Sequence, residues 1–296
     1  MESADLEPRQ LDEAVSFKGG GTVVPPPSLS GAACDGSPKE ARMTIAIIGG
    51  TGFTDMSYLE SPRAQVARTP FGGMTAYAGE YQGRELIFLP RHGPEHNLLA
   101  HQVNYQANIW GLHELGVERI LGVSAIGSLR PQIEPGDFVV MDQLVDFTKH
   151  RDATFHLGSV NFRNPYCDDL RELICAQARE SGQPIHPQAT YLAVEGPRYG
   201  TAAERRLWIS WGMDVIGMTN GTEAALAREL GLCYAVIGMV TDGGSGARKV
   251  ASDLDAHRRV VEEHRAKLRA LTLATAAALP EDRNCICASL AAKPIV

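Results

Sequence analysis

The run Cys233-Tyr-Ala-Val-Ile-Gly-Met-Val-Thr-Asp-Gly-Gly-Ser-Gly246 decides the fold class of this chain. Its apolar part has the length and content of a strand that is buried on both faces, and it gives way directly to glycines. Asp242 stands at this junction. Because ligands bind at the carboxyl ends of strands in open α/β sheets, we predict that Asp242 lies in a binding site. It would act there as a proton donor or as a residue that recognises the ligand.

The segments around this run alternate between strand and helix patterns. Strands are expected at 43–48, 119–124, 138–145, 188–194 and 213–218, and a hairpin joins 74–81 to 85–89. Helices are expected at 101–115, 166–181, 201–211, 222–230 and 253–278. Thr201 is expected to cap the third helix, and Asn220 with Glu223 has the spacing of a capping box for the fourth. The alternation predicts a single α/β domain with a mixed central β-sheet flanked by helices on both faces.

Composition excludes several classes of protein. The chain has 296 residues, is 44% hydrophobic and carries a net charge of −7. A general nucleic-acid binder would need a basic face instead. No apolar stretch reaches the roughly 18 residues of a membrane span, and the acidic N-terminus lacks the apolar core of a secretory signal. We therefore expect a cytoplasmic protein with a sizeable core.

The two ends differ in composition from the middle of the chain. Residues 1–42 are rich in Gly, Pro and Ser without a lasting apolar period, so we expect a disordered N-terminal extension. Residues 43–279 are expected to form the domain, and residues 280–296 a flexible C-terminal tail.

Cysteines and histidines give no clear metal signal. Six cysteines in so long a chain do not indicate a disulfide scaffold. Cys285-Ile-Cys287 has the form of a redox or metal motif, but no second pair or nearby histidine accompanies it, so we expect an inert, exposed pair. His92, His96 and His101 lack the spacing of zinc ligands. No metal site is expected.

Three strand ends carry groups that can bind an anion. Gly49-Gly50-Thr51-Gly52 is a glycine turn whose backbone N–H groups can donate to it, together with the Thr51 hydroxyl. Arg91-His92 follows an apolar strand and offers a guanidinium fork that matches phosphate, with an imidazole beside it. Ser124-Ala125 ends a third strand in small residues that leave room for a ligand. Each motif alone is also consistent with an ordinary turn.

Two further strand ends carry apolar or aromatic side chains. Tyr199 can stack on a flat base, although a single tyrosine is more often a rim residue. Met218 and Thr219 place a thioether and a hydroxyl just before a helix, where the methionine alone would suggest only core. Together with Asp242, the six strand ends predict a site for a ligand that has both an anionic and an aromatic part.

A nicotinamide-dependent dehydrogenase of the short-chain type begins with a similar glycine turn. That class needs a third glycine where this chain has Asp55. It also commonly uses a tyrosine with a lysine four residues later, a pair that this sequence lacks. The dehydrogenase interpretation is therefore disfavoured.

The motifs resemble the methylthioadenosine phosphorylase branch of the trimeric purine nucleoside phosphorylases. The resemblance covers 43–279 in order, and its most specific string is Val103-Asn-Tyr-Gln-Ala-Asn-Ile-Trp110. It implies reversible cleavage of a purine nucleoside by phosphate to the free base and a sugar 1-phosphate. It implies a homotrimer, with phosphate as co-substrate and with no other cofactor and no metal.

The resemblance also implies roles for individual residues. The phosphate site would be formed by Thr51, Arg91, His92, Ser124, Ala125 and Thr219. Met218 would lie beside the ribose and Tyr199 near the base and sugar. Asp242 would face N7 and the 6-amino group of adenine and would donate a proton to the leaving base.

Three departures from the family pattern concern specificity. Gly244 stands where the family usually has a second acid, so Asp242 alone would read the base. The family's Thr-Val-Pro-Glu is here Thr219-Asn-Gly-Thr-Glu223. The segment 253–257, expected near the 5′ position, is more polar than a methylthio group favours, and His257 lies where the 6-oxopurine branch has a histidine. That branch also has Glu after the aromatic residue, where this chain has Gly200.

We therefore predict a phosphorylase acting on methylthioadenosine or a related 5′-modified adenosine. A methylthioinosine or general purine nucleoside phosphorylase is the alternative within the enzymes. A nucleoside-binding protein without turnover is the alternative from another class; the retained phosphate residues argue against it.

Overall fold

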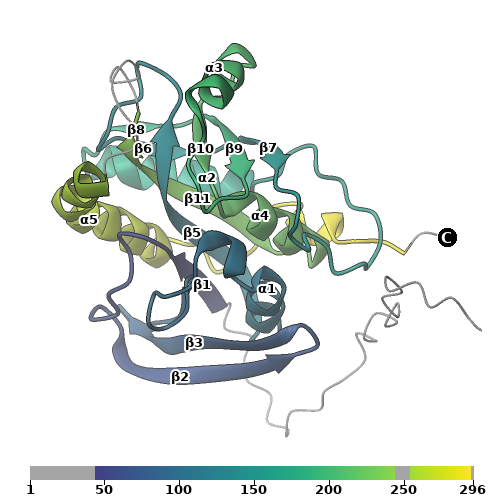
Figure 1. Ribbon diagram of the computed structural model, residues 1–296. Helices are drawn as coiled ribbons and strands as arrows, with labels where there is room; N and C mark the ends of the chain where they lie inside the picture. The colour runs from purple at the N-terminus through teal and green to yellow at the C-terminus, as the bar shows by residue number, and fades with distance from the viewer. Residues whose placement is uncertain (1–43, 244–253, 295–296) are drawn as a thin grey trace, which may run out of the picture. The chain divides into compact units, whose positions relative to one another are not determined.

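The computed structural model describes residues 44–243 and 254–294 (Figure 1). A mixed sheet is flanked by helices on both faces, as the sequence predicts. The strands are β1 (Thr44–Gly49), β2 (Glu60–Thr69), β3 (Gly72–Tyr81), β4 (Arg84–Pro90), β5 (Val117–Ser128), β6 (Phe138–Val140), β7 (Gln143–Phe147), β8 (Ile185–His186), β9 (Thr190–Val194), β10 (Val215–Gly217) and β11 (Cys233–Asp242). The helices are α1 (Tyr105–Glu114), α2 (Asp168–Glu180), α3 (Ala202–Ser210), α4 (Asn220–Glu229) and α5 (Leu254–Ala277), with short 3-10 helices η1 (Ala100–Gln102) and η3 (Cys287–Leu290).

Strand β5 organises the sheet. It pairs in parallel with β1 on one side and with β11 along most of its length on the other. At its carboxyl end it also pairs antiparallel with β10, where Val215 lies opposite Ser128. The strand order β2-β3-β4-β1-β5-β10-β9-β7, with β11, β6 and β8 branching from β5, brings the ends of β1, β4, β5, β10 and β11 near one another.

Two large hydrophobic cores lie on the two faces of this sheet, and a small third cluster contains Leu129, Leu192, Trp208 and Met213. Alternate residues of β1 point to opposite sides: Ala46 and Ile48 join the core beneath α1 and α4, whereas Ile45 and Ile47 join the core beneath α2 and α5. Because both faces are covered, β11 is buried at every residue from 233 to 241. This explains why its sequence is a continuous apolar run rather than an alternating one.

Several predicted elements differ from those observed. The apolar stretch 138–145 is two strands, β6 and β7, which lie in different parts of the sheet. The strand structure is interrupted between them at Asp142, whose Oδ1 accepts a hydrogen bond from the backbone N–H of Ala189 (2.9 Å). Strand β2 lacked a sequence signal because most of its residues are exposed, and the two-residue β8 was also missed.

The helix starts were predicted with mixed success. Thr201 caps α3 and forms a capping box with Glu204, confirming the predicted cap. The capping box at α4 is wrong: Thr219 is its N-cap residue, and Asn220 lies inside the helix with its side chain turned elsewhere. Helix α1 begins only at Tyr105, after the separate turn η1.

Residues 280–294, which we expected to form a flexible tail, are instead held against the domain. Arg119 donates to the carbonyl oxygens of Pro280 (2.6 Å) and Asp282 (2.5 Å), and the N–H of Ala292 donates to Glu229 O (2.9 Å). The expectation that Cys287 is exposed is wrong, because only 3% of it is accessible. The predicted extension 1–42 lies outside the described residues.

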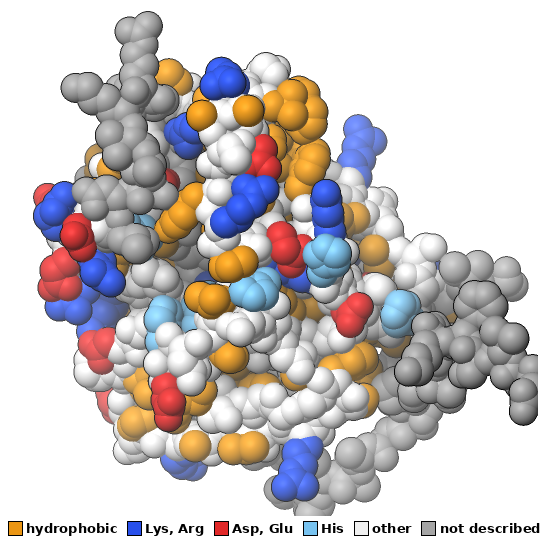
Figure 2. Space-filling model, viewed as in Figure 1, with side chains coloured by type: hydrophobic (Ala, Val, Ile, Leu, Met, Phe, Trp, Pro, Cys, Tyr) orange, Lys and Arg blue, Asp and Glu red, His pale blue; other side chains and the backbone are white. Residues whose placement is uncertain are grey.

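Two properties of the structure concern the membrane proteins and nucleic-acid binders that the composition disfavours. Among the described residues, no helix is long and apolar enough to cross a membrane. On the face shown in Figure 2, basic and acidic side chains are interspersed rather than gathered into a basic surface, in keeping with the net charge of −7.

Candidate active site

A pocket of about 710 Å³ opens at the carboxyl ends of the central strands. It lies where the chain leaves β1, β4, β5, β9, β10 and β11, and α3 and the first turns of α5 complete its wall. Ten of the predicted site residues line it: Thr51, Arg91, His92, Ser124, Ala125, Tyr199, Met218, Thr219, Asp242 and His257. The eleventh, Gly244, lies outside the described residues.

Arg91 is the most deeply buried of these residues, with 1% of it exposed. Its Nε and Nη2 donate to the two carboxylate oxygens of Glu223 (2.5 and 3.0 Å), and its Nη1 donates to Val123 O (2.8 Å). Tyr234 also donates to Glu223 (2.5 Å). The Arg91 guanidinium, which the sequence analysis assigned to phosphate, is thus paired with the carboxylate of Glu223. Two of the five N–H donors of a guanidinium remain for a ligand.

His92 is neutral over a wide range of pH. Burial, followed by the charge of Arg91, lowers its pKa to about 4. Its Nδ1 lies 2.8 Å from Leu98 O, and since a carbonyl only accepts, Nδ1 carries the proton. Nε2 of the neutral ring is then an acceptor. An anion bound at Nε2 would therefore have to bring its own proton, as monohydrogen phosphate does.

Ser124 and Thr219 share one partner. Both hydroxyls donate to Asn220 Oδ1, at 2.8 and 3.0 Å. Asn220 is fully buried, and its Nδ2 has no hydrogen-bond partner among the described residues. Turning the amide over would let Nδ2 donate to both oxygens and free both hydroxyl protons for an anion. Asn220 therefore orients this part of the pocket.

The glycine turn after β1 brings backbone close to Arg91. A Cβ at Gly50 would overlap the Arg91 guanidinium and stand 3.1 Å from Val123 O. Glycine is required here because the turn and the buried arginine share the same space. Thr51 and Ala125 line the same end of the pocket, which thus collects the anion-binding groups.

Asp242 lies at the other end of the pocket. Burial raises the pKa of its carboxyl, while the charges of Arg205 and His257 act in the opposite direction. A raised pKa favours the protonated form, which is the form a proton donor needs. Asp242 Oδ1 occupies the space that a Cβ at Gly127 would fill, 2.5 Å from that position.

The walls between these two ends are aromatic and apolar. Tyr199 is 48% exposed at the rim. Trp208 of α3, which sequence reasoning missed, lines the pocket and is packed so closely on Gly200 that a Cβ there would overlap its ring. Met218 also lines the pocket, and its carbonyl oxygen accepts a hydrogen bond from Arg151.

The part contributed by α5 is less polar than the sequence suggested. Ala256, His257 and Val260 line the pocket, whereas Asp255 is exposed and does not. Burial lowers the pKa of His257, against the effect of Asp242. Of the polar residues expected in this wall, His257 lines the pocket and Asp255 does not. Asp253 lies outside the described residues.

Sequence reasoning missed two residues that support the site from behind, Glu223 and Asn220, and two that line the pocket, Arg205 and Trp208. Glu223 and Asn220 were interpreted as helix caps, and Arg205 and Trp208 were not singled out. A signal existed for Glu223: a carboxylate in the apolar helix 222–230 needs an opposite charge if it is buried.

Comparisons with known proteins agree on one family. The sequence pattern described as "Phosphorylase superfamily" matches residues 44–277. A relative from Dictyoglomus turgidum named probable 6-oxopurine nucleoside phosphorylase is 44% identical over 254 residues, covering 83% of this chain and 95% of that protein. One from Thermofilum pendens named S-methyl-5′-thioadenosine phosphorylase is also 44% identical, over 255 residues, covering 83% and 96%.

Solved structures give the same result. A methylthioadenosine phosphorylase from Schistosoma mansoni in complex with adenine is similar with a TM-score of 0.76 and 30% identity, covering 80% of this chain and 91% of that one. A methylthioadenosine phosphorylase sourced from an antarctic soil metagenomic library gives a TM-score of 0.80 and 31% identity, covering 87% and 93%.

Proposed function

Because the chain belongs to the phosphorylase superfamily, we propose that it is a pentosyltransferase that cleaves the N-glycosidic bond of a purine nucleoside with phosphate. The substrate is S-methyl-5′-thioadenosine or a related 5′-modified adenosine. The products are adenine and the corresponding ribose 1-phosphate. One observation carries the proposal: a single pocket has buried anion-binding groups at one end and Asp242, with a raised pKa, at the other.

The phosphate end supports binding and attack. Arg91 supplies positive charge, Ser124 and Thr219 supply hydroxyls, and Nε2 of neutral His92 accepts a hydrogen bond from the P–OH group of monohydrogen phosphate. Phosphate held below the sugar stabilises the oxocarbenium-like transition state and then forms the new bond to C1′. Thr51 and Ala125, which line the same pocket, complete this end.

The base end supports departure of the purine. Protonated Asp242 donates to N7, which neutralises the leaving base, and Tyr199 covers the base at the rim. Gly200 supports the adenine preference: it has no room for the Glu that the 6-oxopurine branch carries there, because Trp208 fills that space. If Gly244 also faces the base, it adds no second acid.

The 5′ end rests on α5 and Met218. Ala256 and Val260 offer apolar contact for a methylthio group, and His257 offers one polar atom beside it. We further propose a cytoplasmic homotrimer in which a neighbouring subunit completes this end, and no cofactor in catalysis besides the co-substrate phosphate.

A 6-oxopurine nucleoside phosphorylase is the second candidate. Relatives with that name reach the same 44% identity as those named for methylthioadenosine, and His257 lies on the pocket wall. A nucleoside-binding protein without turnover is a third candidate, against which the buried phosphate end argues.

The test compares kcat/KM for methylthioadenosine, 5′-deoxyadenosine, adenosine, methylthioinosine and inosine, with and without phosphate. We expect phosphate-dependent release of adenine, fastest from methylthioadenosine. Turnover without phosphate, or binding without product, would refute the phosphorylase; a preference for inosine would select the second candidate. Asp242→Asn should shift the preference toward 6-oxopurines, whereas the exposed control Asp169→Asn should leave the ratio unchanged.

A further inference from the structure

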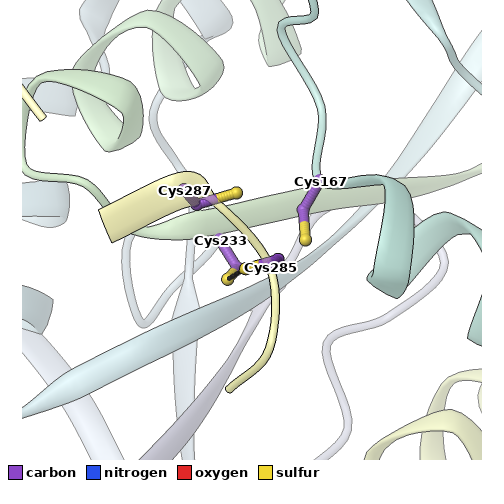
Figure 3. A group of neighbouring side chains, drawn as sticks. All are labelled: Cys167, Cys233, Cys285 and Cys287. Carbon is purple, nitrogen blue, oxygen red and sulfur yellow. Dashed lines mark hydrogen bonds between the residues drawn. The ribbon is translucent and has the colours of Figure 1, made fainter. Parts of the chain in front are cut away.

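Four of the five cysteines in the described residues meet in one place, although they come from three distant parts of the sequence. The sulfurs of Cys167, Cys233, Cys285 and Cys287 all lie within 4.8 Å of one another, and the Cys233 and Cys285 sulfurs are 3.2 Å apart. Figure 3 shows the four side chains gathered from three separate stretches of chain. Cys285 and Cys287, which have no second cysteine pair near them in sequence, therefore lie beside Cys167 and Cys233 in the folded chain.

The positions of these sulfurs come close to those of a tetrahedral metal site. With metal–sulfur distances of about 2.3 Å, four thiolates around Zn²⁺ stand about 3.8 Å from one another. The observed separations, from 3.2 Å to at most 4.8 Å, bracket that value, so small side-chain rotations suffice. Cys167, Cys233 and Cys287 are at most 3% exposed, which leaves no open coordination position for a substrate.

Two arginines provide the counter-charge that such a site needs. Four thiolates and one Zn²⁺ leave two excess negative charges, which are costly to bury without positive partners. Arg228 is 3% exposed and acts electrostatically on Cys287; its Nε and Nη1 have no hydrogen-bond partner among the described residues. Arg283 acts on Cys233 and Cys285, and its Nε is likewise unpartnered there.

We propose that Cys167, Cys233, Cys285 and Cys287 bind one structural Zn²⁺ ion. Each thiol that is still protonated releases its proton to solvent as its sulfur binds the metal, and nothing is oxidised. The ion ties the C-terminal segment to the first residue of β11 and to the N-cap residue of α2. Since β11 carries Asp242 at its other end, the metal stabilises the strand on which the active site depends, without taking part in catalysis.

Metal content is the first test. The chain, purified without a histidine tag from zinc-supplemented medium and passed through a desalting column, should contain about one zinc per chain. Cys285→Ser and Cys287→Ser should each reduce this to less than about a tenth. Cys175→Ser is the matched control, since Cys175 is buried on α2 but outside the cluster, and it should keep the metal.

Two measurements on the unmodified chain do not depend on whether a variant folds. Replacing zinc with Co²⁺ should give thiolate-to-cobalt charge-transfer absorption and the visible bands of a tetrahedral site. Denaturation with chelator and without reductant should release all six cysteines of the chain as free thiols. Missing thiols would show disulfides in place of a metal site. Iron instead of zinc, or no metal after zinc saturation under reducing conditions, would equally overturn the proposal.

Discussion

Adding a single methyl group at Gly127 should impair the base-binding end of the active site and leave phosphate binding intact. A Cβ at this position would stand 2.5 Å from Asp242 Oδ1 and 3.0 Å from Ile216 Cγ2, whereas ordinary contacts begin at 3.4 Å. The carboxylate must therefore retreat by about 0.9 Å. A displacement of about 1 Å in a reacting group costs about 100-fold in rate, or about 2.7 kcal/mol. We expect Gly127→Ala to lose about this much kcat/KM for the nucleoside.

The assay is adenine release from methylthioadenosine, with phosphate and nucleoside varied separately. The KM for phosphate should stay within about twofold, because the nearest atoms to the new methyl group belong to Asp242 and Ile216 and not to a phosphate-binding residue. Gly73→Ala is the matched control: its Cβ would meet only Ala67 O at 3.9 Å, and it should leave both constants unchanged. Tm of both variants reports whether the added methyl group disturbs the fold instead.

A double-mutant cycle identifies the cause. If Gly127→Ala acts by displacing Asp242, the same change in an Asp242→Ala background should cost less than about threefold, because the clashing carboxylate is gone. A full 100-fold loss in that background would refute the reasoning. So would a single variant with near-normal kcat/KM.

Three further predictions concern the phosphate end. Gly50→Ala should raise the phosphate KM by at least about tenfold, because its Cβ would overlap the Arg91 guanidinium. The ratio of adenosine to inosine turnover should stay constant. A changed ratio with an unchanged phosphate KM would contradict this prediction. Since the pKa of His92 is lowered to about 4, its imidazole is neutral above about pH 5. The kcat/KM for phosphate of the unmodified enzyme, divided by that of His92→Asn, should therefore stay constant from about pH 5.5 to 8. An inflection of this ratio near pH 6.5 would show that His92 is protonated there. Glu223→Gln should destabilise the fold by about 3–5 kcal/mol, because it leaves the charge of Arg91 buried and unpaired. Saturating phosphate should recover part of the lost Tm by supplying a new counter-charge, whereas the exposed control Glu262→Gln should neither lower Tm nor respond to phosphate in this way. Equal Tm losses with and without phosphate would refute the idea that phosphate binds at Arg91.

The parts of the fold that sequence predicts are those whose burial leaves a pattern. Strands β1, β5 and β11 are covered on both faces, so each carries an apolar run, and these strands end at Gly49, Ser128 and Asp242. Strand β2 leaves no such pattern because it lies at the edge of the sheet and pairs with β3 through backbone hydrogen bonds that any sequence can make. The division of 138–145 depends on the contact of Asp142 with Ala189, which no local pattern encodes.

The residues that line the pocket were predictable because they follow strand ends. Parallel strands bring their carboxyl ends to one edge, so the position of Arg91, Ser124 and Asp242 in one pocket follows from the strand pattern once the fold is right. Thr219 joins them because β10 runs antiparallel to the end of β5. The orientation of these side chains does not follow from the strand pattern. That Asn220 orders two hydroxyls requires knowing that α4 begins one residue earlier than a capping box would place it.

The supporting residues were out of reach because each depends on a pairing between distant segments. A carboxylate at Glu223, among alanines and leucine, signals that a buried cation is needed, but with 28 lysines and arginines the sequence cannot say which. The answer, Arg91, is 132 positions away. Cys285 has the same difficulty, since the sulfur that lies 3.2 Å from its own belongs to Cys233, 52 positions earlier. In both cases the residue type shows that a partner is needed, but only the folded chain identifies it. The fold brings the residue after β4 to Glu223 of α4, and the first residue of β11 to the C-terminal segment.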